Sequence, residues 1–190
     1  MKSQSGFSLV ELVTVLVIAA IVISIAVPSF ETLIASNRLT TASNDVVALL
    51  QTMRQEALRR NRRVVVCPTD NPTAANPTCS GNNRWNGWMG FVDNDGNNIF
   101  NAGDELLRVE QVKAPTIMSS SSNITGPGII FRSDGLSYRT NGSLLAGNLS
   151  VCLERTNPPD NIRLITVQAG RIGTTRSGNG SGECAIPANP

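Results

Sequence analysis

Oxygen-bearing side chains recur between residues 93 and 104 at a spacing that could bind a metal ion. Counted from Asp93, they occupy the first, third, fifth, ninth and twelfth positions, as Asp93, Asp95, Asn97, Asn101 and Asp104. An EF-hand calcium loop shares this spacing but needs glycine at its sixth position and usually glutamate at its twelfth. Asn98 occupies the sixth position here, and the flanking segments are predicted strands. A β-turn around Asn-Asp-Gly explains these residues more simply. We therefore predict no metal site, and calcium at Asp93, Asp95, Asn97 and Asp104 is the weaker alternative.

The composition and motifs of the chain argue against an enzyme. The chain has no histidine, which is the usual general base and the commonest metal ligand. Serine and threonine are abundant, but neither a Gly-x-Ser-x-Gly nor a Ser-x-x-Lys context is present to activate one of them. The formal net charge of +2 does not argue for a nucleic-acid or membrane-surface partner. We predict a protein that is not an enzyme and that needs no cofactor.

Four cysteines, Cys67, Cys79, Cys152 and Cys184, all follow the N-terminal apolar segment. An even number in this position indicates disulfides formed in an oxidising compartment. Four cysteines allow three pairings, and proximity in sequence favours Cys67–Cys79 with Cys152–Cys184. A zinc site built from all four thiolates is the alternative, although the chain lacks the Cys-x2-Cys spacing typical of such sites.

The segment from Phe7 to Val27 has the length and composition of a membrane-spanning helix. Its 21 residues contain one ionisable side chain, that of Glu11. A carboxylate in lipid is costly and usually functional, unless it reaches the interface or has a cationic partner. A free amino group on Phe7, created by cleavage after Gly6, would supply that partner. A removable secretory signal, with Ser24 and Ala26 near its cleavage site, is the alternative.

The stretch GFSLVEL (residues 6–12) closely resembles the prepilin signature of type IV pilins and type II secretion pseudopilins. The resemblance implies that a prepilin peptidase cuts between Gly6 and Phe7 and methylates the new amino terminus. It also implies that Glu11 pairs with the amino terminus of a neighbouring subunit during assembly. Residues 1–6 would then be the leader.

Helical periodicity continues beyond the apolar segment. Residues 29–61 contain no proline or glycine, and their apolar residues recur at helical spacing on one face. We predict one helix over about residues 7–60, bent or interrupted near Pro28. The segment from Arg54 to Arg63 has five arginines and one glutamate. These positive charges are most simply explained by a favourable interaction with the helix C-terminus and by a solvated face. Contact with another subunit or with DNA phosphates is the alternative.

Strand and turn signals alternate over the rest of the chain. Strands are predicted within residues 63–67, 87–93, 105–112, 128–135, 148–154 and 162–176, the last as a hairpin around residues 168–170. A helix followed by strands predicts an α+β fold in which the long N-terminal helix packs on a mostly antiparallel β-sheet. The expected regions are the leader 1–6, the transmembrane half of the helix 7–27, its amphipathic half 28–62, and a β-rich globular region 63–190.

The globular region resembles the FimU/FimT/GspH branch of minor pilins. The stretches that carry the resemblance are the helix leading into RVVVCP, the segment WMGFVDNDGNNIFNAGDELL and the segment GIIFRSDG. The resemblance implies a pilin fold and a minor pilin that primes a type IV pilus at or near its tip. Its partners would be other major and minor pilins, the prepilin peptidase and the inner-membrane assembly platform. The protein would reside in the bacterial inner membrane with a periplasmic globular domain, and in the extracellular pilus after assembly.

Two other functions follow from the same resemblance. One is a type II secretion pseudopilin of the GspH kind. The other is a DNA-binding pilin, since FimT-type pilins that capture DNA carry a C-terminal Gly-Arg-x-Arg motif. The chain has Arg171 after Gly170 but lacks the second arginine at its expected place, and Arg176 would have to substitute for it. Trp85, Trp88 and Tyr138 could stack on bases, although a core or interface role is more common for such residues.

Overall fold

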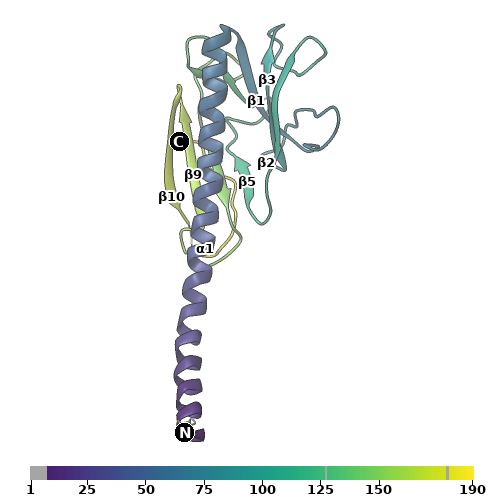
Figure 1. The fold of residues 1–190 in the computed structure, drawn as a ribbon. Coiled ribbons are helices and arrows are strands. Elements are labelled where there is room, and N and C mark those ends of the chain that lie inside the picture. The colour runs from purple at the N-terminus through teal and green to yellow at the C-terminus, as the bar shows by residue number, and fades with distance from the viewer. Residues whose placement is uncertain (1–7, 127, 179) are drawn as a thin grey trace.

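The computed structural model describes residues 8–126, 128–178 and 180–190. Its longest element is α1 (Leu9–Arg60), a helix of 52 residues. The Ser8 hydroxyl caps its N-terminus by accepting a hydrogen bond from the Glu11 amide, and Asn61 ends it in the left-handed conformation. At about 1.5 Å per residue, α1 is about 78 Å long, and Figure 1 shows that its first half projects well beyond the sheets.

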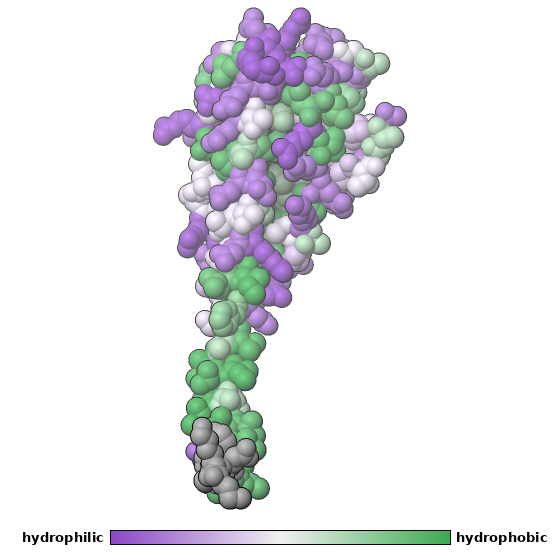
Figure 2. All heavy atoms as spheres, viewed as in Figure 1, coloured by the Kyte–Doolittle hydropathy of each residue, from purple (hydrophilic) through white to green (hydrophobic). Residues whose placement is uncertain are grey.

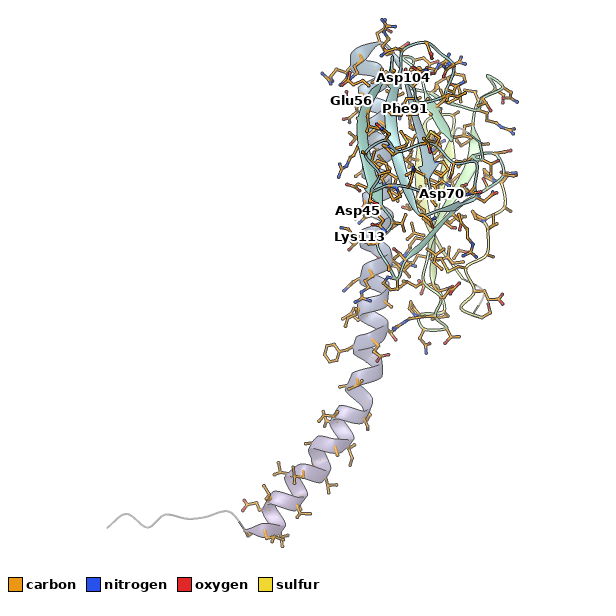
Figure 3. The ribbon with its side chains drawn as sticks, turned by 90° about the vertical axis from the view of Figure 1, so that its right-hand side faces the viewer. Asp45, Glu56, Asp70, Phe91, Asp104 and Lys113 are labelled. Carbon is orange, nitrogen blue, oxygen red and sulfur yellow. A yellow bond between two sulfur atoms is a disulfide. The ribbon has the colours of Figure 1, made fainter. Side chains whose placement is uncertain are left out.

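The backbone of α1 remains helical through position 28. Figure 3 shows that the N-terminal part of the helix is inclined to the part that packs on the sheets. The single long helix expected from the periodicity is therefore present. The attribution of a bend to Pro28 remains a prediction.

The second half of α1 packs on the sheets through one face. The buried apolar positions follow the helical period, each lying three, four or seven residues from another member of the set: Ala35, Leu39, Val46, Leu49, Leu50, Met53 and Ala57. This spacing keeps them on one side of the helix. Ala42, also expected there, is half-buried against the same core. The predicted apolar face is confirmed, and it determines which side of the helix meets the sheets.

The strands form two five-stranded antiparallel sheets. The first has the order β4-β3-β1-β6-β7 and the second the order β10-β9-β8-β5-β2. The strands of the first sheet are β1 (Arg63–Thr69), β3 (Gly87–Asp93), β4 (Glu105–Gln111), β6 (Ile129–Phe131) and β7 (Ser137–Tyr138). Those of the second are β2 (Arg84–Trp85), β5 (Ile117–Ser120), β8 (Ala146–Cys152), β9 (Ile162–Gln168) and β10 (Arg171–Ser177).

The predicted α+β fold class is confirmed, and so is the hairpin, which is β9 and β10 joined by Ala169 and Gly170. The sequence did not indicate that the strands divide into two sheets. It also missed β2, β5 and β7, which have two to four residues each. Strands this short contain too few alternating positions for the period of two to emerge.

The main core lies between α1 and the inner faces of the sheets. Leu39 and Leu50 of the helix belong to the same cluster as Phe131 of the first sheet and Ile165 of the second. A smaller cluster on the other face of the first sheet contains Phe91, Met89 and Cys67. The amphipathic half of α1 thus holds both sheets in place and leaves its apolar N-terminal half unpacked.

Candidate functional site

The N-terminal half of α1 is an exposed apolar stem, which we define as residues 9–34. Its apolar side chains are largely exposed, including Leu9 at 78%, Ile18 at 62% and Phe30 at 62%. Figure 2 shows this stem as a nearly continuous hydrophobic surface below a domain of mixed polarity. Within the described residues, α1 is the one helix whose length and apolar content suffice to cross a membrane, with a mean hydropathy of 2.8 in its most apolar window. Such a surface requires lipid or other protein around it.

Glu11 lies in the first turn of this stem. The helix dipole favours a negative charge there. Among the described residues, its carboxylate accepts no hydrogen bond and forms no ion pair. The expected cleavage position, Gly6 and Phe7, lies outside the described residues. The pairing of Glu11 with an amino terminus therefore remains a proposal.

The candidate calcium residues lie in the loop between β3 and β4. The structure brings carboxylate oxygens of Asp93, Asp95 and Asp104 within 4.8 Å of one another. Asn97 contributes differently, since its side-chain amide donates to Asp95 at 2.6 Å and its carbonyl oxygen accepts from the Ile99 amide at 2.6 Å.

Hydrogen bonds within this loop already engage the three carboxylates. Asp93 accepts from the amides of Gly96 and Asn98, and Asp104 accepts from those of Asn94 and Asn101. Burial raises the pKa of Asp93. These bonds are those of a polar turn between two antiparallel strands, which favours the β-turn interpretation.

The arginine-rich end of α1 is used largely inside the molecule. Arg54 donates to the Gly170 carbonyl at 2.8 Å, and Arg60 donates to Glu56 on α1 and to Glu105 on β4. Arg63 donates to the Gly96 carbonyl at 2.7 Å and lies 3.5 Å from Asp93. These contacts join the helix end to both sheets, so they account for much of the charge without an external partner.

The three aromatic residues considered for base stacking are engaged inside the domain. Trp85 is buried and donates from its ring nitrogen to the Ser120 hydroxyl at 3.0 Å, and Trp88 is buried in the main core. The Arg132 guanidinium lies 4.0 Å from the ring centroid of Tyr138, whose hydroxyl donates to Asp134 at 2.6 Å. Their arrangement is that of core and strand-end residues.

We expect Tyr138→Phe to raise the pKa of the Asp134 carboxyl toward its ordinary value. The hydrogen bond from Tyr138 is the main reason that this pKa is lowered. A lowered folded-state pKa stabilises the fold above the unfolded pKa, and the stabilisation disappears as the pH falls through the folded value. The difference in free energy of unfolding between the two proteins should therefore disappear as the pH falls through the folded-state pKa of Asp134. Carboxyl NMR titration and urea unfolding across this range measure both effects, and identical Asp134 titrations would contradict the prediction.

Arg171 and Arg176 both lie on β10, but they do not form one patch. Side chains alternate between the faces of a strand, so residues five apart point to opposite faces. Ile172, which shares its face with Arg176, packs against the main core, and Arg176 lies 4.0 Å from Asp160. A Gly-Arg-x-Arg motif would place its two arginines on one face, and this arrangement does not.

Both disulfides expected from sequence proximity are present. Cys67 is bonded to Cys79, and Cys152 to Cys184, with Cα–Cα distances of 5.5 and 5.7 Å. The alternative of a four-thiolate zinc site is wrong, because all four sulfurs are in disulfides. Cys67–Cys79 closes the proline-rich loop after β1, and Cys152–Cys184 attaches the C-terminal tail to β8.

Sequence reasoning missed a groove along one side of α1. Its volume is about 500 Å³, and it lies between α1 and the connection from β4 to β5. Ile34 and Asp45 line it from the helix and Lys113 from the connection, and Figure 3 shows Asp45 and Lys113 on the same side of the domain. Ile34 also belongs to the exposed stem, so the groove extends the stem surface into the domain. Residues so distant in sequence gave no signal of this proximity.

Two family models match the chain. The model of the family described as type II transport protein GspH matches residues 42–170, and the model of the prokaryotic N-terminal methylation motif matches residues 1–27. No curated protein matches significantly.

Two crystal structures of the type IV minor pilin FimU from Pseudomonas aeruginosa PAO1 are similar. The first, in space group P65, is 21% identical over 72% of this chain and 92% of the FimU chain, with a TM-score of 0.46. The second, in space group P21, is 20% identical over 74% of this chain and 90% of the FimU chain, with a TM-score of 0.45.

Proposed function

The chain belongs to the family of type II transport protein GspH, and from this premise we propose that it is a minor pilin that helps to prime assembly of a type IV pilus at or near the tip. The observation that carries the proposal is the exposed apolar stem, which is joined to a folded domain and lies largely within the residues 1–27 that match the N-terminal methylation motif. A stem of this kind can be surrounded by lipid before assembly and by the helices of other subunits afterward.

Four regions divide the work in this proposal. Residues 1–6 are a leader removed by a prepilin peptidase, which then methylates Phe7. Residues 7–27 anchor the protein in the bacterial inner membrane, and Pro28 allows the helix to bend above them. Residues 28–62 hold the sheets, and residues 63–190 face neighbouring subunits in the periplasm. Partners are other pilins and the assembly platform, and the assembled protein lies in the extracellular pilus.

Glu11 provides the assembly contact in this proposal. A carboxylate in an apolar surface without a partner of its own is stabilised by an opposite charge at the same depth. The amino terminus created at Phe7 of an adjacent subunit would provide that charge. The groove beside α1 supports side-by-side packing, since it continues the stem surface into the domain.

We expect Glu11→Ala to leave leader removal intact but to reduce incorporation into the fibre by about tenfold or more, because the neighbouring amino terminus loses its partner in an apolar environment. Leader removal is measured by the mass of the membrane-bound protein, and incorporation by immunodetection of sheared fibres. Thr14→Ala, in the same stem, is the matched control. Normal incorporation of the Glu11 variant would refute the role.

A type II secretion pseudopilin is the second candidate function, because the matching family model describes a type II transport protein. Both functions use the same stem and the same Glu11. Deletion of the gene separates them, since loss of pili supports the first function and loss of protein secretion supports the second.

A further inference from the structure

The edges of the two sheets differ in their capacity to pair with another chain. β2 and β7 have two residues each, whereas β4 and β10 have seven. Each of these long strands ends its sheet. β10 pairs with β9 in unbroken register, contains no proline and is exposed at every position except Ile172. An edge strand of this kind presents a row of backbone donors and acceptors to a partner strand.

The hydrogen-bond pattern specifies which residues of β10 face outward. Ala169 and Gly170, at φ 47° and 87°, form a two-residue turn of the type I′ class. Such a turn makes Gln168 and Arg171 a hydrogen-bonded pair, so alternate residues point their backbone groups away from β9. Ile172, Thr174 and Arg176 therefore offer their N–H and C=O groups to a partner.

The same reasoning applies to β4. The Val112 amide donates to the Asn86 carbonyl at 2.9 Å, and Glu110 lies opposite Trp88 in the register that follows. The backbone N–H and C=O groups of Glu110 and Arg108 therefore point toward β3, while those of Val109 and Gln111 point away from it. A register shift opposite Gly90 and Phe91 interrupts this alternation near Leu107. The regular outer edge of β4 is thus residues 107–111.

Both edges run in the same direction along α1. β10 begins after Gly170, whose carbonyl contacts Arg54 of α1. It ends near Arg176, which lies opposite Arg163, and the Arg163 side chain contacts Ser36 of α1. β10 therefore runs toward the N-terminal end of the helix. β4 begins at Glu105, whose side chain contacts Arg60 of α1, and runs toward the groove that Asp45 lines, which is also toward the N-terminal end of the helix. Figure 1 shows β10 on one side of α1 and β3, the neighbour of β4, on the other.

This direction limits the pairings that are possible. Copies anchored by their stems in one membrane share one orientation, a premise that depends on the proposed function. Antiparallel pairing of β10 with β10 would point the two stems in opposite directions, so it is not available to them. Parallel pairing of β10 with β4 of a second copy keeps both stems aligned. It also leaves the helix-facing sides of the two sheets on the same side, which a parallel β10–β10 pair would not.

We propose that residues 173–177 of one copy pair in parallel with residues 107–111 of a second copy. Thr174 lies opposite Arg108 in this register, and Arg176 opposite Glu110. The outward groups of Thr174 and Arg176 then meet those of Val109 and Gln111, as a parallel ladder requires.

Charge complementarity supports this register. Arg176 shares the face of Ile172, which packs on the core beneath α1, and Glu110 lines a small cavity with Ala42 and Val46 of α1. Both charges therefore lie on the side of their sheet that faces the helix. Arg176 has 72% of its side chain exposed, and Glu110, which also pairs with Arg108 of its own strand, has 41%, so both present charge to a partner.

The pairing is staggered along the stem. β10 begins at the level of Arg54 on α1, and β4 begins at the level of Arg60. These two levels are six residues, or about 9 Å, apart along the helix. The copy that offers β4 must therefore sit about 9 Å closer to the membrane end. A head-to-tail contact with a repeated shift generates a helical array rather than a closed dimer.

Cysteine cross-linking of two differently tagged full-length chains, co-produced in one bacterial membrane, tests the proposal. One chain carries Ser177→Cys and the other Gln111→Cys, positions that lie opposite each other in the register and leave Arg176 and Glu110 in place. We expect a mixed dimer on oxidation, because adjacent strands bring Cα atoms within disulfide range. Each variant alone should give no cross-linked dimer. Dimers of the Ser177→Cys chain with itself, or the absence of a mixed dimer, would overturn the proposal.

Charge reversal then tests the register. Arg176→Glu in the first chain, or Glu110→Arg in the second, should lower the cross-linked fraction several-fold, and both together should restore it. Reversals that leave the fraction unchanged would overturn the assigned register. The Glu11→Ala experiment separates the two proposals. If Glu11→Ala reduces incorporation into the fibre, as expected, but the mixed dimer is absent, the proposed function stands and only the edge pairing is refuted.

Discussion

Gly128→Ala is expected to destabilise the fold by about 3 kcal/mol or more. Gly128 has φ +87°, and a Cβ atom there would lie 1.9 Å from the Val66 carbonyl oxygen and 2.8 Å from the Cys67 Cα. Both neighbours are backbone atoms of β1, so β6 would have to move away from β1 to make room. The cost combines left-handed strain of about 1–2 kcal/mol with overpacking of about 1–3 kcal/mol. Urea unfolding of the full chain in detergent, followed by fluorescence of the two buried tryptophans, measures it.

Gly126→Ala is the matched control. Gly126 has nearly the same backbone conformation, with φ +85°, but no atom lies within 4 Å of a Cβ placed there. Its substitution should cost only the strain, about 1–2 kcal/mol. Equal losses in the two variants would show that the close approach of β6 to β1 contributes nothing.

Removal of the Cys152–Cys184 disulfide by paired alanine substitution should cost about 2–5 kcal/mol. The bond spans 32 residues and attaches the C-terminal tail to β8. The tail has further contacts that depend on this attachment, since Asn148 donates to the Ala188 carbonyl at 2.8 Å and the Asn123 amide donates to Asn189 at 3.0 Å. The same unfolding measurement applies, and hydrogen exchange of residues 185–190 should rise.

Paired removal of Cys67–Cys79 is the comparison for this result. That bond spans 12 residues, and a shorter loop restricts the unfolded chain less. On chain entropy, its removal should cost about 1 kcal/mol less than removal of Cys152–Cys184. The reverse order would show that native contacts, rather than loop length, dominate the effect.

The long helix illustrates what could be predicted without a structure. Apolar residues every three or four positions specify its buried face, and the absence of proline and glycine after Pro28 specifies its extent. The membrane-spanning segment, residues 7–27, followed from composition alone, since its 21 consecutive residues carry one ionisable side chain and have the length to cross a bilayer. The disulfide pairs followed from proximity, because short loops close at the lowest entropic cost.

The acidic loop marks the limit of such predictions. Its spacing allowed calcium or a turn, and only the structure shows that Asp93 and Asp104 accept hydrogen bonds from backbone amides across the turn. Likewise, Arg54 reaches the Gly170 carbonyl across 116 residues, and nothing in the local sequence around either residue indicates this contact.

The stem, the amphipathic helix and the order of the longer strands could be predicted from the sequence. These are local properties, because periodicity and composition act over a few neighbouring residues. The three-dimensional fold was needed to show that the strands form two sheets and that β4 and β10 are their long edges. It also placed Glu110 and Arg176 on the helix-facing sides of their sheets. These features depend on which strands pair and in which register, and pairing is decided by contacts between residues far apart in the chain.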